Sequence, residues 1–495
     1  MNLSDAIEVN ARRRPDHPAI VESNGEITTY REYENAVRRW ASVLRNMEIG
    51  SGDIVGLNLK DTPDHLIALY AIARSGAAVL PMDWRWTDEE KTRIADFFGA
   101  RAVFSEPDDT FLSVTGRWSD IAVNEDWRRH TDQIEPQCEF PDGENQPLLL
   151  ALSSGTTGTP KGPLITHEQF LARFLIYLIT IGFSERDRYL CATPLYFGGC
   201  RGYSMCTLYA GGTVLMHPPP YEMPDLLSYA NRFRATRLFL VPTLLRRLLA
   251  TEGGSPEKPV FESLELLFST GAVLHPEERT ELMHRFCPRY LNFYGSTDGG
   301  GCSALLWDDP AGAADSVGRP VFGATLEIVD DRDDPVECGE VGRIRYRHPG
   351  TASGYHNDPE ASLGSFRNGW YFPGDLGWVD DAGYLFLAGR ETDMIIRGGI
   401  NIYPAEIEHV LTLHPAIHEA AVLGWPSREF GEEVAAFVVR AQGADLVNSD
   451  DLRSYCRERI APYKVPREVF VIDALPKSGV GKVLKTELAK SLPQL

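Results

Sequence analysis

The sequence predicts an α/β fold: a large N-terminal domain of helix-covered parallel sheets with a β-barrel-like subdomain, followed by a small α+β C-terminal domain. Three observations lead to this expectation. The first half alternates between helical and strand-like segments. From about residue 316 the segments become short alternating runs separated by Gly, Asp and Pro, which is typical of antiparallel strands. The length of 495 residues corresponds to roughly three units of about 150 residues. We place the domains at 1–390 and 391–495.

The N-terminal half carries the helix–strand alternation. Residues 31–47 and 63–76 have apolar side chains at helical spacing. Thr87 precedes three acidic residues, which is typical of a helix N-terminus. Strand-like apolar runs lie between or after these helices: DIVGLNL at 53–59, AAVLPMD at 77–83 and ARAVFSE at 100–106. Such alternation favours parallel strands covered by helices.

The later part of the chain has a different pattern. The expected antiparallel strands are SVGRPVFGATLEIVDD at 316–331, GEVGRIRYR at 339–347 and GYLFLAGR at 383–390. Beyond Arg390 the pattern becomes that of a small α+β unit. Its strand-like runs are EAAVLGWP at 419–426 and EVAAFVVRA at 433–441, and a helix is expected within DLRSYCRERI at 451–460.

Charge and cysteine content limit the partners that we expect. The formal charge is 49 − 70 = −21, which gives no overall attraction to nucleic acid or to an anionic membrane. The eight cysteines include no C-x-x-C pair, as expected for free thiols in a reducing cytoplasm. The sequence shows no secretory signal and no apolar run long enough to span a membrane. We therefore expect a cytoplasmic protein. The sequence is compatible with a homodimer.

A loop rich in glycine and hydroxyl groups follows the apolar run PLLLAL. Residues 152–162, LSSGTTGTPKG, contain three glycines, five hydroxyl side chains and one lysine. Glycines let backbone N–H groups approach an anion, hydroxyls donate hydrogen bonds, and the lysine adds charge. The loop does not match the mononucleotide P-loop, which requires glycine before its lysine and a serine or threonine after it. Here Pro160 precedes Lys161, and Gly162 follows it. The order of these residues indicates a phosphate-binding loop, whereas composition alone also allows a surface loop of turn-forming residues.

Further stretches accompany this loop in a fixed order. They are Thr270-Gly271-Ala272, Asn292-Phe-Tyr-Gly-Ser-Thr-Asp298, Ser316-Val-Gly-Arg-Pro320, Gly369-Trp-Tyr-Phe-Pro-Gly-Asp375, Gly389-Arg390 with DMIIRGGINIYPAEIE, and Pro476-Lys-Ser-Gly-Val-Gly-Lys482. Together they resemble the motifs of the acyl-adenylate-forming superfamily, which contains acyl-CoA synthetases, adenylation domains of peptide synthetases and luciferases. The resemblance extends over nearly the whole chain.

The resemblance implies a reaction in two steps. A carboxylate attacks the α-phosphate of ATP, giving acyl-AMP and pyrophosphate, and a nucleophile then displaces AMP. The first step joins two anions, so the site must offset their charges. ATP and Mg²⁺ are the implied cofactors. The C-terminal domain 391–495 is implied to be a mobile lid that carries the catalytic lysine.

The resemblance also assigns catalytic roles to individual residues. Lys482 is expected to bridge the carboxylate and the α-phosphate region, as a compact cation with rotatable donors can. Thr297 is expected to donate to the α-phosphate, and Arg390 to reach the ribose or a phosphate. Asp298 is the expected Mg²⁺ ligand, although the family usually has Glu there; the shorter carboxylate still binds Mg²⁺ directly or through water.

Nucleotide binding is assigned to a larger set. Asp375 is expected to accept hydrogen bonds from both ribose hydroxyls, and Tyr294 to pack on the adenine. The complete set is Ser153, Ser154, Gly155, Thr156, Thr157, Gly158, Lys161, Gly271, Ala272, Asn292, Tyr294, Gly295 and Asp375.

The acid substrate is expected to bind near Tyr196, Phe197, Gly271 and Gly299. Phe197 stands where many acid–CoA ligases have a histidine. An aromatic wall at that position favours an aromatic or medium-length apolar acid. Arg201 is a candidate partner for a second substrate carboxylate, but we expect it to face solvent.

The expected acyl acceptor is CoA, so the leading hypothesis is an acyl-CoA synthetase. Gly398 and Gly399 would let the pantetheine chain pass close to the backbone. Phe430 falls where CoA ligases often have an aromatic residue, and Lys464 and Arg467 could meet the CoA phosphates. Phe430 in the core and Lys464 on a solvated face are the alternatives.

Three other functions remain open. In an amide bond synthetase of the same superfamily an amine captures the acyl-adenylate; Thr392 at the hinge and Ile400 before Asn401 depart from the usual pattern and fit this alternative. An enzyme that loads a carrier-protein thiol is less favoured. A catalytically silent binding protein is disfavoured because Lys161, Asp375, Arg390 and Lys482 are present.

Overall fold

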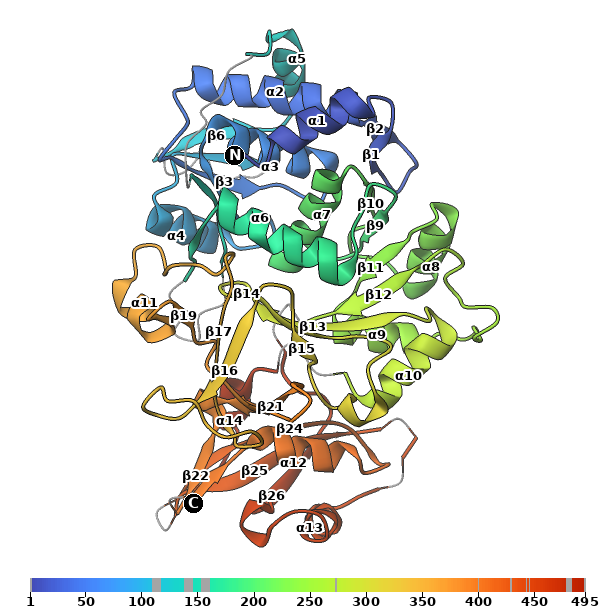
Figure 1. The fold of residues 1–495 in the computed structure, drawn as a ribbon, viewed down its shortest axis with the longest axis vertical. Coiled ribbons are helices and arrows are strands. Elements are labelled where there is room, and N and C mark those ends of the chain that lie inside the picture. Colours follow the sequence, from blue (N-terminus) through green and yellow to red (C-terminus); the bar gives the residue numbers. More distant parts are fainter. Residues whose placement is uncertain are drawn as a thin grey trace. The chain divides into compact units, whose positions relative to one another are not determined.

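The computed structural model divides the chain into two compact units (Figure 1). The residues that the structure describes are 2–108, 117–137, 146–152, 161–271, 274–398, 400–427, 430–441, 443–444, 446–477 and 483–493. The first unit comprises Met1–Ala314, Pro320–Thr325 and Tyr346–Tyr371; the second comprises Asp315–Arg319, Leu326–Arg345 and Phe372–Leu495. The second unit thus contains the predicted 391–495 domain together with preceding strands. The predicted boundary after residue 390 stays a prediction.

Strands of the first unit form two sheets. Their bounds are β1 (Pro18–Val21), β2 (Ile27–Thr29), β3 (Ile54–Asn58), β4 (Ala78–Pro81), β5 (Ala102–Ser105), β6 (Ser119–Ala122), β7 (Pro147–Leu150), β8 (Leu164–Thr166), β9 (Arg188–Cys191), β10 (Thr213–Met216), β11 (Arg237–Phe239), β12 (Leu266–Ser269), β13 (Tyr290–Ser296) and β14 (Gly300–Leu305). One sheet runs β14-β13-β12-β11-β9-β10-β1-β2 and the other β6-β5-β3-β4-β7-β8. The central pairs are parallel, which confirms the predicted α/β class.

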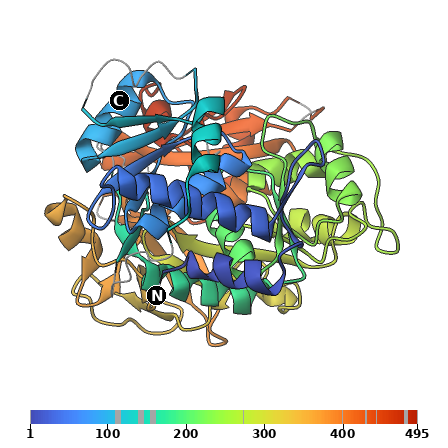
Figure 2. The same cartoon turned by 90° about the horizontal axis from the view of Figure 1, so that it is seen from above.

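Helices connect these strands. They are α1 (Asp5–Arg13), α2 (Tyr30–Asn46), α3 (Pro63–Ser75), α4 (Asp88–Phe98), α5 (Glu125–Gln133), α6 (His167–Ile176), the π-helical η2 (Tyr177–Ile181), α7 (Gly198–Ala210), α8 (Met223–Arg232), α9 (Pro242–Leu249), α10 (Pro276–Arg285) and α11 (Pro359–Ser365). Thr87 caps α4 through a reciprocal capping box with Glu90, which confirms the predicted N-terminus. Figure 2 shows α1 and α2 side by side.

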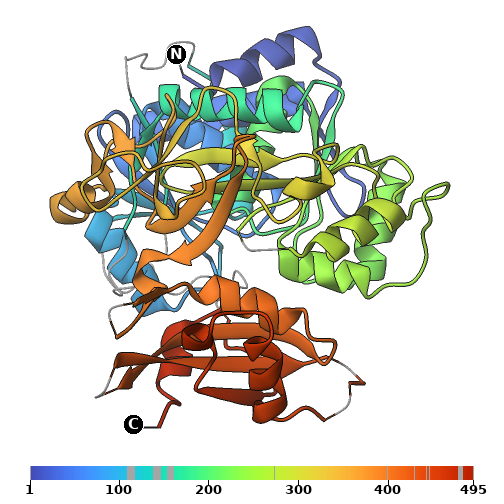
Figure 3. The ribbon, with the colours of Figure 1, turned by 60° about the horizontal axis from the view of Figure 1, so that its bottom comes forward.

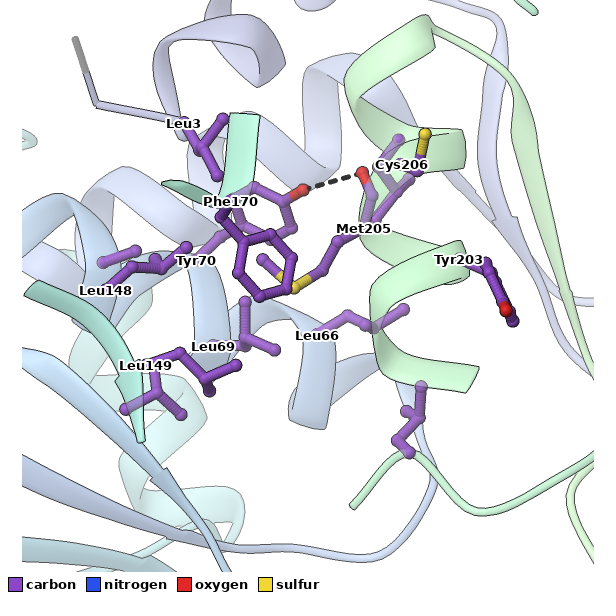
Figure 4. Packing of buried hydrophobic residues seen from close by; sticks show 14 of the residues in the cluster. Leu3, Leu66, Leu69, Tyr70, Leu148, Leu149, Phe170, Tyr203, Met205 and Cys206 are labelled. Atoms are coloured by element: carbon purple, nitrogen blue, oxygen red, sulfur yellow. Dashed lines mark hydrogen bonds between the residues drawn. The ribbon is translucent and has the colours of Figure 1, made fainter. Parts of the chain in front are cut away.

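The core of the first unit joins helices that belong to different sheets. Helix α3 links β3 to β4, whereas α7 links β9 to β10. Both are buried along almost their whole length. The Tyr70 hydroxyl of α3 donates to the Met205 carbonyl of α7 at 3.1 Å, and Leu66, Leu69 and Tyr203 belong to the same buried cluster (Figure 4). The N-terminal end of α7 is therefore carried by a rigid core element.

The second unit is built mainly from antiparallel strands, as predicted. Its strands are β16 (Thr325–Val329) and β17 (Gly342–Arg347), apart from Thr325 and residues 346–347, which belong to the first unit, and β20 (Asp375–Val379), β21 (Leu385–Arg390), β22 (Ile395–Arg397), β23 (Ile400–Ile402), β24 (Ile417–Ser427), β25 (Gly431–Arg440) and β26 (Glu468–Ile472). Its helical segments are η4 (Glu391–Asp393), α12 (Pro404–Thr412), α13 (Ser449–Arg457), η5 (Pro462–Lys464) and α14 (Lys485–Ala489). The antiparallel pair β24–β25 is extended by β26, parallel to β25, and α12 packs against β24 (Figure 3).

Short elements complete the description: β15 (Arg319–Pro320), β18 (Phe366–Arg367), β19 (Trp370–Tyr371) and η3 (Ala311–Ala313). Within the described residues, none of the helices combines the length and apolar character needed to cross a membrane.

Candidate active site

Several predicted site residues lie outside the described residues. They are Ser153, Ser154, Gly155, Thr156, Thr157, Gly158, Ala272, Gly399 and Lys482. Their assigned roles stay predictions. Lys161, near the end of the predicted phosphate loop, is described and connects that loop to the rest of the site.

Tyr355 connects Lys161 with the predicted metal ligand. The Lys161 ammonium lies 5.8 Å from the centre of the Tyr355 ring, and the Tyr355 hydroxyl donates to Asp298 Oδ2 at 2.9 Å. The carbonyl of Gly162 accepts from the His356 N–H at 2.9 Å, which fixes the chain beside Lys161. Burial and the Asp298 carboxylate raise the pKa of Tyr355, so this hydroxyl remains a donor. A cation and a buried carboxylate thus flank one aromatic ring.

Arg173 holds the backbone that carries Thr297 and Asp298. Its Nη1 donates to the Thr297 carbonyl and its Nη2 to the Asp298 carbonyl, both at 2.9 Å, while Nε donates to the Gly350 carbonyl at 2.8 Å. Burial lowers the pKa of Arg173. We did not predict this residue. Its signal was an arginine within the otherwise apolar run FLARFLI of α6.

Glycines next to Asp298 are required by close packing. A Cβ atom at Gly299 would lie 2.3 Å from Tyr346 Oη and 2.3 Å from Tyr371 Cδ1. A Cβ atom at Gly295 would lie 2.4 Å from the Gly300 carbonyl oxygen. Two tyrosine rings therefore occupy the space that a side chain at residue 299 would need.

The predicted adenine-binding residues gather at one sheet edge. Strands β12 and β13 are parallel, with Ser269 in register with Asn292. Gly271 follows β12 at the same carboxyl end, where ligands of open α/β sheets bind. It has a left-handed φ of 95°, and no atom of the described residues lies within 4 Å of the Cβ position that a side chain would need. Tyr294 continues β13 beyond Asn292. The geometry thus brings these residues together at the carboxyl end of the parallel strands.

Tyr196 and Phe197, predicted for the acid pocket, lie directly before α7. Their ring centres are 4.0 Å apart. A Cβ atom at Gly198 would lie 3.5 Å from Thr297 Cγ2. The start of α7 is therefore next to the residue expected to contact the α-phosphate.

A second aromatic segment surrounds Tyr196 and was missed by sequence reasoning. Trp86 meets the Tyr196 ring edge-on with centres 6.4 Å apart, and the Arg85 guanidinium lies 5.3 Å from the ring centre. Asp83 holds Arg85 by two hydrogen bonds, at 2.9 and 2.8 Å. The available signal was the cluster of tryptophans around Arg85 in MDWRW.

The expectation that Arg201 faces solvent is wrong. Its exposed fraction is 2%. Nη1 donates to the carbonyls of Leu195 and Tyr196, at 3.2 and 2.6 Å. The side chain turns back toward the start of α7, as helical geometry favours, and is buried there.

In the second unit, the predicted ribose residues contact each other. Asp375 and Arg390 are partners in the β20–β21 register, and Arg390 Nε lies 2.7 Å from Asp375 Oδ1. The side chain of Arg390 is 51% exposed and that of Asp375 is 14% exposed. Arg390 also donates to the Pro373 carbonyl at 3.1 Å. The pair is preformed but accessible on the arginine side.

Gly398 and Phe430, predicted near the second nucleophile, are in contact. Gly398 has a left-handed φ of 58°, and its N–H donates to the Phe430 carbonyl at 2.8 Å. A Cβ atom at Gly398 would lie 3.4 Å from Phe430 Cδ1. The ring of Phe430 stacks near the Arg397 guanidinium, 4.6 Å from its centre.

The basic residues considered for the CoA phosphates are already paired. Lys464 contacts both carboxylate oxygens of Glu406, at 2.7 and 2.6 Å. Arg467 lies 3.3 Å from Glu433, which also receives two bonds from Arg397. Lys464, whose side chain is 20% exposed, would have to exchange Glu406 for a phosphate, whereas Arg467, 49% exposed, contacts Glu433 through one of its nitrogens only.

Comparisons with known proteins agree with this geometry. A family model described as AMP-binding enzyme matches residues 7–356, and one described as AMP-binding enzyme C-terminal domain matches 406–482. The indoleacetate–CoA ligase of Aromatoleum aromaticum is 32% identical over 513 residues, covering 99% of this chain and 98% of that protein. The amide bond synthetase McbA from Marinactinospora thermotolerans has a TM-score of 0.89 at 25% identity, covering 99% of each chain.

A third similar protein was solved with nucleotide and metal. It is the o-succinylbenzoate coenzyme A synthetase of Bacillus subtilis in complex with ATP and magnesium ion, with a TM-score of 0.86, 27% identity and 98% coverage of each chain. The fold, the site and these matches define an adenylate-forming ligase. The chain belongs to the AMP-binding enzyme family.

Proposed function

We propose that this enzyme uses ATP to convert a small carboxylic acid to acyl-AMP, releases pyrophosphate, and then transfers the acyl group to CoA. The observation that carries the first step is the group formed by Lys161, Tyr355 and Asp298. It combines a cation at the end of a phosphate-binding loop with a buried carboxylate, joined by one aromatic ring. This combination suits a triphosphate and its counter-ion.

Mg²⁺ fits the donor set around Asp298. Asp298 is 6% exposed and is oriented by Tyr355. Among the described residues, no three His, Cys, Asp or Glu side chains come together as a metal cage. Mg²⁺ prefers one or two carboxylates supplemented by phosphate oxygens and water. We therefore propose Asp298 as the protein ligand, with the remaining positions filled by ATP and water; bound Mg²⁺ would neutralise phosphate charge.

The other predicted residues take the roles assigned to them by their motifs. Asp375 accepts from the ribose, Thr297 donates to the α-phosphate, and Lys482 bridges the two reacting anions. We propose that residues 391–495 move as a lid about the hinge residue Thr392 to deliver Lys482. The short segment η4 (Glu391–Asp393), which contains Thr392 and separates β21 from β22, is consistent with a hinge at that point.

CoA is the preferred acceptor because two of the three similar proteins named above, the indoleacetate and o-succinylbenzoate enzymes, are CoA ligases. We place the reaction in the cytoplasm on the evidence of the sparse cysteines. A homodimer is compatible with this proposal.

An amine acceptor is the second candidate, and a specific observation favours it. Lys464 and Arg467, the cations considered for the CoA phosphates, are paired with Glu406 and Glu433. The similar chain McbA is described as an amide bond synthetase. Under this alternative the acyl-adenylate forms from ATP and the acid as in a CoA ligase, and an amine then attacks it to give an amide and AMP.

The test has two stages. Purified protein with ATP, Mg²⁺ and a panel of aromatic and aliphatic acids should release pyrophosphate with at least one acid. Absence of release with every acid would exclude the adenylation chemistry and favour a silent binding protein. With a working acid, CoA and a panel of amines are then compared. Thioester without amide at modest amine concentration excludes the amide reaction, and amide without thioester excludes CoA transfer.

A further inference from the structure

Arg201 is a buried cation in the first turn of α7. It is among the largest fully buried side chains of the molecule. Helix α7 is anchored in the core through Met205, which accepts from Tyr70 (Figure 4). The position of the guanidinium is therefore set by a rigid element, and its burial is not the result of a loose surface loop.

The guanidinium has no anionic partner within the described part of the chain. Both of its hydrogen bonds use Nη1 and end on neutral carbonyls, those of Leu195 and Tyr196. Nε has no hydrogen-bond partner there. Burial lowers the pKa of Arg201 to about 10, and the groups that oppose this shift are the Cys200 thiol and the Tyr177 phenol, not a carboxylate. Burying a charge is costly unless it is paired.

Two other buried arginines, Arg74 and Arg173, meet that cost in different ways. Arg74 pairs with the Glu34 carboxylate at 2.6 Å. Arg173 uses Nε, Nη1 and Nη2 on three separate carbonyls. Arg201 follows neither pattern. Its Nε–H and the adjacent Nη2 form the side of the guanidinium that suits a bidentate carboxylate, and that side is left without a partner among the described residues.

The surroundings add further positive potential. Helix α7 has thirteen residues, and its N-cap residue Phe197 provides no side-chain cap. The first N–H groups of a helix carry partial positive charge and favour an anion. A guanidinium at the same helix end is unfavourable unless a negative group is present. One carboxylate, that of Asp61, already lies near this helix end, where it accepts from the Leu195 N–H at 2.6 Å. Among the described residues it makes no hydrogen bond to the guanidinium, so the hydrogen-bonding capacity of Arg201 still favours an additional anion.

The unpartnered side of Arg201 lies next to the predicted acid-binding residues. A Cβ atom at Gly198 would be 3.5 Å from Thr297 Cγ2 and 4.0 Å from Arg201 Nη2. Arg201 and the residue expected to contact the α-phosphate thus lie close to the same glycine. Tyr196 and Phe197, predicted to line the acid pocket, immediately precede it.

We propose that Arg201 determines substrate specificity by binding a second anionic group, in the simplest case a second carboxylate, on the acid that the enzyme activates. This inference rests on the proposed function. It narrows the expected substrate from an apolar acid to an acid whose far end carries a negative charge. The Nε–H and Nη2 groups would donate to that charge, while Tyr196 and Phe197 pack against the apolar part between the two ends.

The test compares matched acids with the wild-type enzyme. Each pair consists of a dicarboxylic acid and its monocarboxamide, which has almost the same size but lacks the second charge. Pyrophosphate release should show kcat/KM at least tenfold higher for the diacid of the preferred chain length. If monocarboxylic acids are activated and no diacid is preferred, the role of Arg201 is overturned while the proposed function stands. If no acid releases pyrophosphate, the proposed function itself fails.

Variants at Arg201 locate the effect. Arg201→Met should remove the preference for the diacid and leave the KM for ATP within twofold of wild type. Arg201→Lys, which keeps the charge but not the paired donors, should retain part of the preference. Arg247→Met on α9 is the matched control and should change neither the preference for the diacid nor the KM for ATP. An equal loss of activity toward diacids and monocarboxamides in Arg201→Met would overturn the proposal in favour of a structural role or a contact with the reacting carboxylate. If Arg201→Met does not fold, the wild-type comparison and Arg201→Lys still decide the outcome.

Discussion

The loop around Asp298 and the Asp375–Arg390 pair hold predicted nucleotide-binding groups in opposite ways. Asp298 is buried, its backbone is held by Arg173, and the adjacent glycine leaves no space for a side chain. Asp375 and Arg390 form an ion pair whose arginine is half exposed. The first arrangement is fixed before a ligand arrives, whereas the second can exchange partners with little loss of stability. Substitutions should therefore damage folding in the first region and nucleotide use in the second.

The largest effect is expected at Gly299. Gly299→Ala places a methyl group against Tyr346 and Tyr371, so the free energy of unfolding of the first unit should fall by about 3 kcal/mol. Thermal unfolding, monitored by circular dichroism, measures the change. Gly364→Ala on α11 is the control, because outside its own helix no atom in the described part of the chain lies within 4 Å of its Cβ position. Equal stability of the two variants would contradict the packing argument.

Removing Arg173 should have the next largest effect. Arg173→Met withdraws donors from three carbonyls, and each buried carbonyl left without a donor costs about 1–3 kcal/mol. Partial access of water reduces the expected total to about 2–3 kcal/mol. Denaturant unfolding measures it. Arg12→Met, with a side chain 76% exposed, should change stability by less than about 0.5 kcal/mol. A neutral Arg173→Met would show that the loop is held by other contacts.

Lys482→Ala tests the other side of the comparison, a residue expected to act in chemistry and not in folding. Adenylation should fall by more than about tenfold, equivalent to ~1.4 kcal/mol in the barrier, while thermal stability stays at the wild-type value. Pyrophosphate release under saturating ATP is the readout. Lys490→Ala, whose side chain is 71% exposed, serves as the control. Unchanged adenylation in Lys482→Ala would remove its assigned role.

Asp375→Asn should weaken nucleotide binding without affecting the fold. Loss of a charged acceptor for the ribose, worth about 1 kcal/mol, should raise the KM for ATP about fivefold. The free energy of unfolding should change by less than about 0.5 kcal/mol, because the ion pair with Arg390 is partly exposed. Asp381→Asn, in an exposed turn, is the matched control. A large loss of stability in Asp375→Asn would show that the pair is structural.

The smallest effect concerns pH. Burial and the nearby Arg173 lower the pKa of His348 to about 4. Between pH 6.5 and about 4 the unfolded chain therefore takes up a proton that the folded protein does not, so stability falls as pH falls through this range. The wild-type free energy of unfolding should fall between pH 7.5 and pH 5.5, and His348→Gln should make this fall smaller by about 1 kcal/mol. Urea unfolding at both pH values measures it. An unchanged pH dependence would contradict a neutral buried His348.

Local patterns in the sequence predicted the architecture well. Apolar spacing predicted α2 and α3, and the Thr87 pattern predicted the start of α4. These features depend on neighbouring residues, so a single sequence displays them. The ordered motifs also predicted residues that the structure brings together, such as Gly271 and Asn292 at the ends of adjacent parallel strands.

Contacts between distant residues were beyond such reasoning. Arg173 donates to three carbonyls that lie 124, 125 and 177 residues further along the chain. A pattern of neighbouring residues cannot indicate contacts over such separations. Tyr355 likewise meets Asp298 across 57 residues. The expectation for Arg201 was wrong because charged residues are mostly exposed. Its neighbours include His65 of α3 and Tyr177 of η2, which are distant in sequence, so no local pattern indicates its burial.

The absence of space at Gly299 also bears on how the enzyme can be redesigned. Tyr346 and Tyr371 leave no room there for even a methyl group, so saturation mutagenesis at that position should return mainly inactive, poorly folded clones. Libraries intended to change the accepted acid are better directed at Trp86, Tyr196 and Phe197. The carbonyls that Arg173 holds belong to Thr297, Asp298 and Gly350, so substitutions at the three aromatic positions leave those hydrogen bonds their partners.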